Sequence, residues 1–344
     1  MFCRSQYQAV SVSLRVLVAA VACSPMLVRA AEDYSSLPHS TLQNPFSDAN
    51  LLPCAACDSG CCGNVACGNA CGCGNGKLFG LFAPSDHCYD SFISPMTNPV
   101  FFEDPRTLTE ARAIYLHHVI PSAVATGGEL DLVALQLRAA LTDRLSIVAA
   151  KDGYLTSSNP LIQDGWANVS AGLKYNLHAD PRKQRLLSTG FAYEMPVGTP
   201  RSQQGIGDGD FHVYLTGGAE FWNHWHWLSG SGFRLPTDHN TGSTMFYWSN
   251  HVDVEFCDGW YALAETNWYN YTRSGGGGIN GVEGGDLLNL GSTDVAGNDI
   301  VTQAFGLKYK RSRHRELGIA FEFPLTDQRD VLENRLTVDW IFRY

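Results

Sequence analysis

The last nine residues of the chain alternate between two sets of side chains. One set is Leu336, Val338, Trp340, Phe342 and Tyr344, and the other is Thr337, Asp339, Ile341 and Arg343. Successive side chains of an extended chain point to opposite faces, so this pattern predicts a β-strand with one apolar face and one mainly polar face. Such a strand turns its apolar face either to a protein core or to the hydrocarbon of a membrane.

Segments with the same two-residue period recur along the chain from residue 110 onward. Twelve of them span residues 110–121, 128–141, 144–152, 165–177, 185–197, 210–222, 226–236, 243–256, 259–271, 299–310, 315–324 and 332–344. Short turns at 142–143, 178–184, 223–225, 257–258 and 311–314 alternate with longer loops at 155–164, 198–209, 237–242, 272–298 and 326–331. The connection at 122–127 is shorter than these loops. Segments 110–118 and 130–141 could also form amphipathic helices.

The terminal strand and the alternating loop lengths resemble bacterial outer-membrane β-barrel proteins. The resemblance implies an all-β, antiparallel, up-and-down transmembrane barrel of about twelve strands, with tight periplasmic turns and long outer loops. It also implies that the apolar face from Leu336 to Tyr344 serves as a signal for the barrel-assembly machinery. The alternative is a soluble β-sandwich or jelly roll, which does not require alternating loop lengths.

The amino terminus has the features of an export signal. Arg4 and Arg15 precede the apolar run 16–22, and small residues near Ala30 suit cleavage before Ala31. We therefore predict a secretory signal peptide over residues 1–30 and location in the outer membrane. The run is shorter than the roughly 18 apolar residues of a spanning helix. The residues before Cys23 resemble a lipoprotein cleavage site, so lipidation of Cys23 stays open.

Residues 31–105 contain many Pro, Gly and Cys residues and show no sustained period. We predict a Cys-rich irregular extension in the periplasm, followed by the barrel over residues 106–344. The cysteines after residue 31 are Cys54, Cys57, Cys61, Cys62, Cys67, Cys71, Cys73, Cys88 and Cys257. An exported chain favours disulfides or cross-links over a metal site, because the stretch has no histidine. We expect Cys88 and Cys257 to lie at the same end of the barrel and to be able to form a bridge.

The polar parity of the strands predicts the residues that line the interior. The acids are Glu194, Glu220, Asp253, Glu255, Glu265, Glu316, Glu322 and Asp339, and the bases are Arg112, Arg138, Lys174, Arg234, Lys308 and Arg343. Two hypotheses stay open. Rings of acids could select cations in a water-filled pore, or interleaved acids and bases could form an ion-pair network that plugs the barrel.

A catalytic site is not expected. Ser249, His251 and Asp253 share one face of a strand, but residues two apart along a strand are about 7 Å apart, beyond hydrogen-bond distance. The net charge of −10 makes nucleic acid an unsuitable partner. No cofactor or metal is expected.

The resemblance implies a passive channel or transporter for small solutes, in contact with outer-membrane lipid. The loop 272–298 is long enough to fold into the mouth of such a barrel. The alternative is a non-conducting anchor of the outer membrane whose Cys-rich segment cross-links it to other components.

Overall fold

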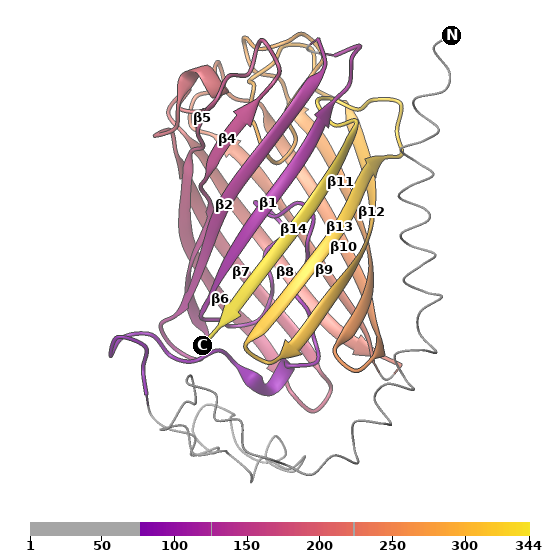
Figure 1. The fold of residues 1–344 in the computed structure, drawn as a ribbon. Coiled ribbons are helices and arrows are strands. Elements are labelled where there is room, and N and C mark those ends of the chain that lie inside the picture. The colour runs from indigo at the N-terminus through magenta and orange to yellow at the C-terminus, as the bar shows by residue number, and fades with distance from the viewer. Residues whose placement is uncertain (1–75, 125, 223) are drawn as a thin grey trace, which may run out of the picture. The chain divides into compact units, whose positions relative to one another are not determined.

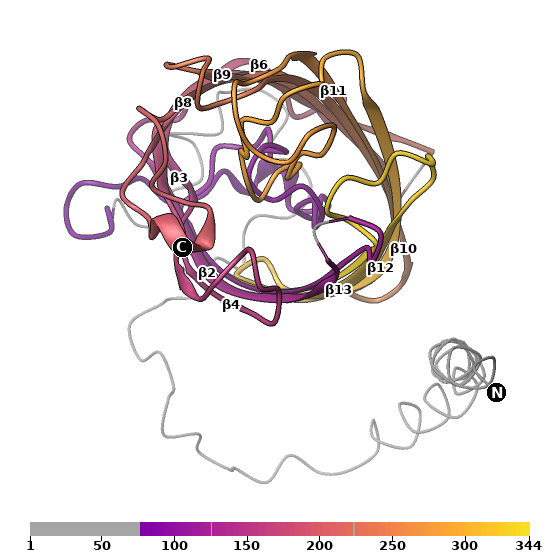
Figure 2. The ribbon, with the colours of Figure 1, turned by 90° about the horizontal axis from the view of Figure 1, so that it is seen from above.

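A computed structural model describes residues 76–124, 126–222 and 224–344 as a closed ring of antiparallel strands (Figures 1 and 2). The strands are β1 (Glu110–Ile120), β2 (Gly128–Ala140), β3 (Leu145–Lys151), β4 (Tyr154–Ser157), β5 (Gly165–Trp166), β6 (Val169–Asp180), β7 (Arg185–Met195), β8 (Asp210–Phe221), β9 (Trp225–Pro236), β10 (Thr244–Cys257), β11 (Trp260–Arg273), β12 (Asp299–Ser312), β13 (Arg315–Pro324) and β14 (Asn334–Arg343). The ring closes because β1 pairs with both β2 and β14.

The wall contains twelve strands, as the sequence pattern predicts. The pieces β3 and β4 form one wall strand, since both pair with β2. The pieces β5 and β6 form the next wall strand, since β5 pairs with β4 and β6 pairs with β3. The first break lies at Gly153, whose φ is +119° and where a Cβ would lie 2.5 Å from the carbonyl oxygen of Val133. Beside it, the backbone N–H of Leu135 donates to the Asp152 carboxylate at 2.8 Å. Glycine therefore permits the bend, and Asp152 accepts the hydrogen bond that the ladder loses.

The two ends of the barrel differ in the length of their connections. The short-turn end carries the connections 141–144, 181–184, 222–224, 258–259 and 313–314, together with the C-terminus (Figure 1). The long-loop end carries 121–127, 158–164, 196–209, 237–243, 274–298 and 325–333. Both segments that could have been helical, 110–118 and 130–141, are strands. The described residues contain two short 3-10 turns, η3 (His87–Tyr89) and η4 (Pro200–Ser202), and no helix long and apolar enough to cross a membrane.

The outward face of the wall is apolar and the inward face is polar. On β8, Phe211, Val213 and Leu215 are exposed, whereas His212 and Thr216 are buried. The same parity holds along β13 and β14. A water-soluble sandwich would have the opposite arrangement, so that alternative is wrong. An apolar exterior around a charged interior is the arrangement that contact with hydrocarbon requires.

The apolar residues of the last strand point outward. Trp340, Phe342 and Tyr344 are exposed, and Leu336 and Val338 are half-buried. Their role as an assembly signal stays a prediction, because the fold depends equally on their contact with hydrocarbon.

Aromatic side chains surround the short-turn end. The exposed ones there are Trp222, Trp225, Trp227 and Trp260. At the other end Trp268 is half-buried, but Tyr269 and Tyr271 are fully buried in the interior. These two tyrosines therefore do not belong to an outer ring of aromatic side chains, because they share the inward parity of Glu265 on the same strand.

The apolar exterior gives a depth-dependent prediction. We expect Leu215→Arg, at the middle of β8, to lower the free energy of unfolding in lipid vesicles by roughly 2–4 kcal/mol, because it places a cation in the hydrocarbon centre. The matched control is Leu235→Arg, one residue from the end of β9, which should cost roughly 0–1 kcal/mol. Urea titrations would measure both, and equal costs would contradict a membrane-embedded exterior.

Candidate functional site

The segment that precedes β1 runs inside the barrel. We call residues 89–109 the plug segment, and Figure 2 shows it as the indigo chain within the ring of strands. Phe92, Ile93 and Phe102 of this segment are each at most 1% exposed. The sequence predicts that residues up to 105 form an extension outside the barrel. Residues 89–105 lie inside the barrel instead. Their lack of any period reflects contacts with many different strands.

Glu103 attaches the plug segment to one side of the wall. Its carboxylate accepts hydrogen bonds from Nε and Nη2 of Arg138 on β2 at 2.7 and 2.6 Å, and from Nζ of Lys174 on β6 at 2.8 Å. Burial by itself would raise the pKa of Glu103, but Arg138 and Lys174 lower this pKa to about 2. The carboxylate is therefore charged at physiological pH.

Glu265 on β11 holds the opposite side of the plug segment. The backbone N–H groups of Met96 and Thr97 donate to its carboxylate at 2.7 and 2.6 Å, and the Thr97 hydroxyl donates as well. Nδ1 of His251 on β10 lies 2.6 Å from the same carboxylate. Glu265 is fully buried. These contacts fix the middle of the plug segment by its backbone, so the attachment depends little on the side chain of Met96.

The group Ser249, His251 and Asp253 does not form a catalytic triad. Nε2 of His251 lies 2.9 Å from the Asp253 carboxylate, so the expectation that these side chains could not meet is wrong. Side chains two apart can lean toward each other along a strand. However, the Ser249 hydroxyl accepts a hydrogen bond from Asn98 of the plug segment at 2.9 Å. Both ring nitrogens of His251 face carboxylates, of Asp253 and Glu265, so neither is placed to activate Ser249.

A third cluster lies where β12, β13 and β14 meet β1. Arg343 pairs with Glu110 at 2.7 Å and also with Glu316, and Lys308 lies 3.0 Å from Asp339 and 3.5 Å from Glu316. Lys308 also donates to the backbone carbonyl of Ser94 in the plug segment at 2.9 Å. The charges of the wall are therefore largely paired within the wall in this region.

The loop 274–298 closes the long-loop end from inside. Asp286 lies 2.8 Å from Nη1 of Arg335 on β14, and Nη1 of Arg234 on β9 donates to the carbonyls of Gly285 and Leu288 at 3.0 and 3.1 Å. Leu287 and Leu288 belong to a buried apolar cluster with residues of β1 and β2. Figure 2 shows this loop, in orange, reaching inward over part of the opening.

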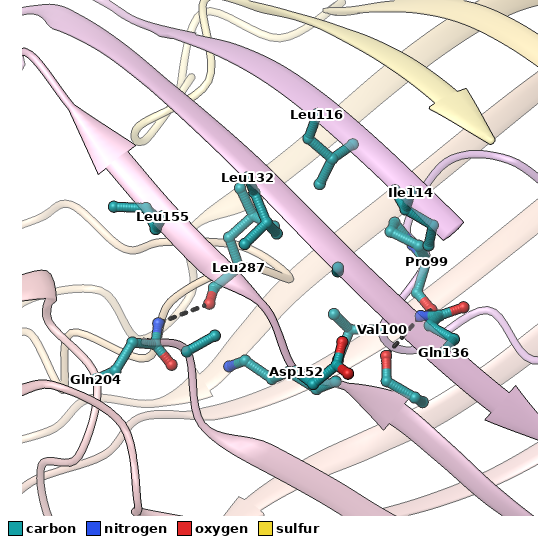
Figure 3. Close-up of a pocket in the computed structure, with 14 residues that line it drawn as sticks. Pro99, Val100, Ile114, Leu116, Leu132, Gln136, Asp152, Leu155, Gln204 and Leu287 are labelled. Atoms are coloured by element: carbon teal, nitrogen blue, oxygen red, sulfur yellow. Dashed lines mark hydrogen bonds between the residues drawn. The ribbon is translucent and has the colours of Figure 1, made fainter. Parts of the chain in front are cut away.

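The space left between the plug segment and the loop is small. A cavity of about 30 Å³ lies among Pro99 and Val100 of the plug segment, Leu287 of the loop, and Ile114 and Leu132 of the wall (Figure 3). This volume holds at most a few water molecules. Around this cavity the plug segment and the loop therefore fill the lumen, and the buried acid–base pairs fit the hypothesis of an ion-pair network.

Most residues expected in the lumen are buried inside the barrel. The buried ones are Arg112, Arg138, Lys174, Glu194, Arg234, Asp253, Glu265, Lys308, Glu316, Glu322, Asp339 and Arg343. Glu220 and Glu255 are only half-buried, near the turn 222–224. Glu255 faces His224 at 3.5 Å and accepts a hydrogen bond from the backbone N–H of Gly259. These two acids lie at the rim of the barrel.

The sequence analysis missed several charged residues of the interior. On the wall they are Glu110, Lys151, Asp210, Lys310 and Arg335, and outside the wall they are Glu103, Asp104, Arg106, Glu283, Asp286 and Asp330. The first group has the inward parity of its strands and could have been found from it. The second group lies in irregular segments, where no local pattern indicates burial.

Cys257 carries a free, exposed thiol, so the expected bridge between Cys88 and Cys257 is wrong. Cys257 is the last residue of β10 and is exposed to solvent. Cys88 lies in the 3-10 turn η3. The other candidate cysteines, from Cys54 to Cys73, lie outside the described residues, as does the signal peptide over residues 1–30.

The hydroxyl of Thr97 gives a test of the plug attachment. We expect Thr97→Val to lower the free energy of unfolding by about 1–2 kcal/mol, because the buried Glu265 carboxylate loses a donor. Thr156→Val, on the exposed face of β4, is the control and should change little. Denaturant titration in detergent would measure both, and an unchanged Thr97→Val protein would mean that this contact does not hold the plug segment.

Asp330 gives the closure of the long-loop end a pH dependence. Burial, together with the nearby charge of Glu283, raises the pKa of Asp330 to about 6, against hydrogen bonds from Gln328, Tyr271 and the backbone of Glu283. A raised pKa means that the folded state binds the proton more tightly, so this stabilisation is complete below about pH 3.8 and is lost as pH rises through about 6.

We therefore expect amide exchange of residues 283–290, corrected for intrinsic rates, to become faster between pH 5 and 7.5. The difference over this range corresponds to about 1.4 kcal/mol, because pH 5 lies about one unit below the folded-state pKa of about 6 and one unit is worth about 1.4 kcal/mol. Asp330→Asn should remove this dependence, whereas Asp327→Asn, in the same connection but exposed, should keep it. The same pH dependence in Asp330→Asn would rule out Asp330 as its origin.

Comparison with known proteins agrees with the fold. No family model matches the chain, and no curated protein matches it in sequence. An outer-membrane channel from Pseudomonas putida is 13% identical, with a TM-score of 0.50 over 74% of this chain and 100% of that chain. The NanC porin (10% identity, TM-score 0.45, 69% and 100% covered) and the KdgM porin (12%, 0.41, 68% and 99%) are also similar. The chain has the fold of an outer-membrane β-barrel.

Proposed function

We propose that this protein is a passive outer-membrane channel for small solutes and that the plug segment closes it in the described conformation. Solutes pass when the plug segment shifts within the lumen or leaves it. Export by residues 1–30, insertion by the barrel-assembly machinery and a periplasmic location of the short-turn end belong to the same proposal.

The observation that carries the proposal is the way in which the plug segment is attached. Among the described residues, none from 90 to 106 has a backbone-to-backbone hydrogen bond to the wall. Every wall strand instead pairs with its two neighbours, so the ring is complete without the plug segment. Its contacts with the wall use side chains such as Glu103 and Glu265, which water or ions can replace. Displacing it therefore breaks no part of the sheet.

The sequence predicts an acid-rich lumen, and cation selection is one of the two hypotheses that it leaves open. Over the wall strands that the structure describes, the buried side chains comprise eight acids and nine bases. The acids in excess lie in the plug segment and the loops, which are the parts that would move. The proposal therefore does not include a cation preference.

The alternative is a non-conducting anchor that is cross-linked through its Cys-rich segment. The filled interior supports this alternative, since a barrel that only anchors needs no pathway for solutes. A buried ion-pair network is, however, a costly filling compared with apolar residues of the same volume. This cost favours a lumen that is filled reversibly.

Cross-linking the plug segment to the wall tests the proposal. Asn98 and Ser249 form a hydrogen bond at 2.9 Å, so Asn98→Cys with Ser249→Cys, in a background without other cysteines, can be joined by a short reducible cross-linker. In planar bilayers we expect the uncross-linked protein to conduct, the cross-linked protein to lose at least 90% of its conductance, and a reductant to restore it.

The control is the single variant Ser249→Cys with the same reagent, which should keep its conductance. Equal conductance with and without the cross-link would mean that the plug segment does not gate the barrel. A silent protein in every state, including Thr97→Val, would support the anchor.

A further inference from the structure

We infer that the wall site now filled by Glu103 binds small carboxylate anions and that Glu103 is its built-in occupant. This inference rests on the proposed function, because a solute reaches the site only when the plug segment shifts. It names the class of solute that the channel would take.

The geometry of the site is that of carboxylate recognition. The guanidinium of Arg138 presents Nε and Nη2 side by side to the two oxygens of Glu103, at 2.7 and 2.6 Å. Lys174 adds a third donor at 2.8 Å to the oxygen that Nε also contacts. Paired N–H groups of arginine match the two oxygens of a carboxylate, and the added ammonium strengthens the attraction.

The wall does not neutralise this site. Among the described residues, Lys174 has no carboxylate within 4.0 Å except Glu103. Arg138 has one wall partner, Glu110 at 3.0 Å, which bonds to Nη1 and leaves the Nε–Nη2 edge to Glu103. Glu110 is also shared with Arg343. Without Glu103, the buried cations Arg138 and Lys174 would therefore have only the Glu110 carboxylate nearby on the wall, which Arg343 also uses.

Most other wall cations differ in this respect. Arg112, Lys151 and Lys308 each have a partner acid on the wall itself, at 2.9, 2.6 and 3.0 Å. They stay paired whatever the plug segment does. Arg234 is matched by Glu283 of the loop 274–298 at 3.8 Å and does not depend on the plug segment either. Lys174 and the Nε–Nη2 edge of Arg138 are instead matched by a carboxylate of the plug segment, so they would meet an anion that enters when this segment shifts.

Desolvated cations attract an anion that reproduces the lost hydrogen bonds. A buried charge without a partner is strongly unfavourable, so displacement of Glu103 must bring either water or another anion to the site. A small carboxylate offers two oxygens and can restore all three hydrogen bonds, whereas chloride must share a single, larger centre among the three donors and matches the two-oxygen geometry of the fork less well. The site therefore favours carboxylates over halides.

The test is rescue of a variant that lacks the occupant. Full-length Glu103→Ala keeps Cβ and loses CH2–COO⁻, and propionate supplies the same carboxylate on a chain that is one carbon longer than acetate. Thermal unfolding in detergent is compared in 100 mM sodium propionate, in sodium chloride, and in sodium chloride with propionamide. We expect propionate to raise the midpoint by roughly 3 °C or more over both. If the variant refolds only poorly in chloride, refolding yield replaces the midpoint as the readout.

Two controls define the site. Adding Arg138→Gln to Glu103→Ala should abolish the preference for propionate, because the fork is lost. Glu194→Ala removes the acid that faces Lys151, a lone ammonium without a fork, and should show no such preference. Equal effects of all salts, a preference that survives Arg138→Gln, or failure to fold in propionate as well as in chloride would overturn the inference.

The result is separable from the proposed function, because stability is measured without any current. Rescue by propionate in a barrel that never conducts would support the carboxylate site and contradict the proposed channel function. Conductance without rescue would support the channel function and contradict the carboxylate site. If both hold, propionate should also reduce the chloride current of Glu103→Ala at least twofold in bilayers, and Arg138→Gln should remove this block.

Discussion

The whole structure depends on one constraint: the outside of the ring faces hydrocarbon, so charged and strongly polar side chains of the strands must point inward. A strand allows only two directions, and apolar residues such as Leu215 and Ile319 occupy the outer one. The inward parity then receives Arg138, Glu265 and Asp339, among others. These groups are far from bulk water, so each needs a partner.

The need for partners explains why the lumen is filled from two sides. The wall pairs many of its own charges, as in the cluster of Arg343 with Glu110 and Glu316. Other cations are matched by acids from segments outside the wall. Glu103 of the plug segment faces Lys174 and one edge of Arg138, and Glu283 of the loop 274–298 faces Arg234. The segments that fill the lumen are thus also the segments that balance the charge of the wall.

This arrangement combines a permanent wall with replaceable contents. The wall is held by backbone ladders that close on themselves through β1 and β14, and these do not depend on solution conditions to a large degree. The contents are held by ion pairs and hydrogen bonds between side chains, whose strength depends on competing ions and, at Asp330, on pH. A closed lumen and a channel are therefore compatible in one structure.

The sequence by itself determined the twelve wall strands, nearly all of their bounds, and the inward direction of residues such as Glu316 and Lys308, because a period of two is a local property of the chain. The tertiary structure alone decided where the irregular parts lie. The plug segment has no period, since its neighbours come from strands all around the ring, and its burial follows from charges as far along the chain as Glu265 and Arg343. The approach of His251 to Asp253 likewise depends on side chains of the neighbouring strands, His226 on β9 and Glu265 on β11, which the sequence of β10 does not contain.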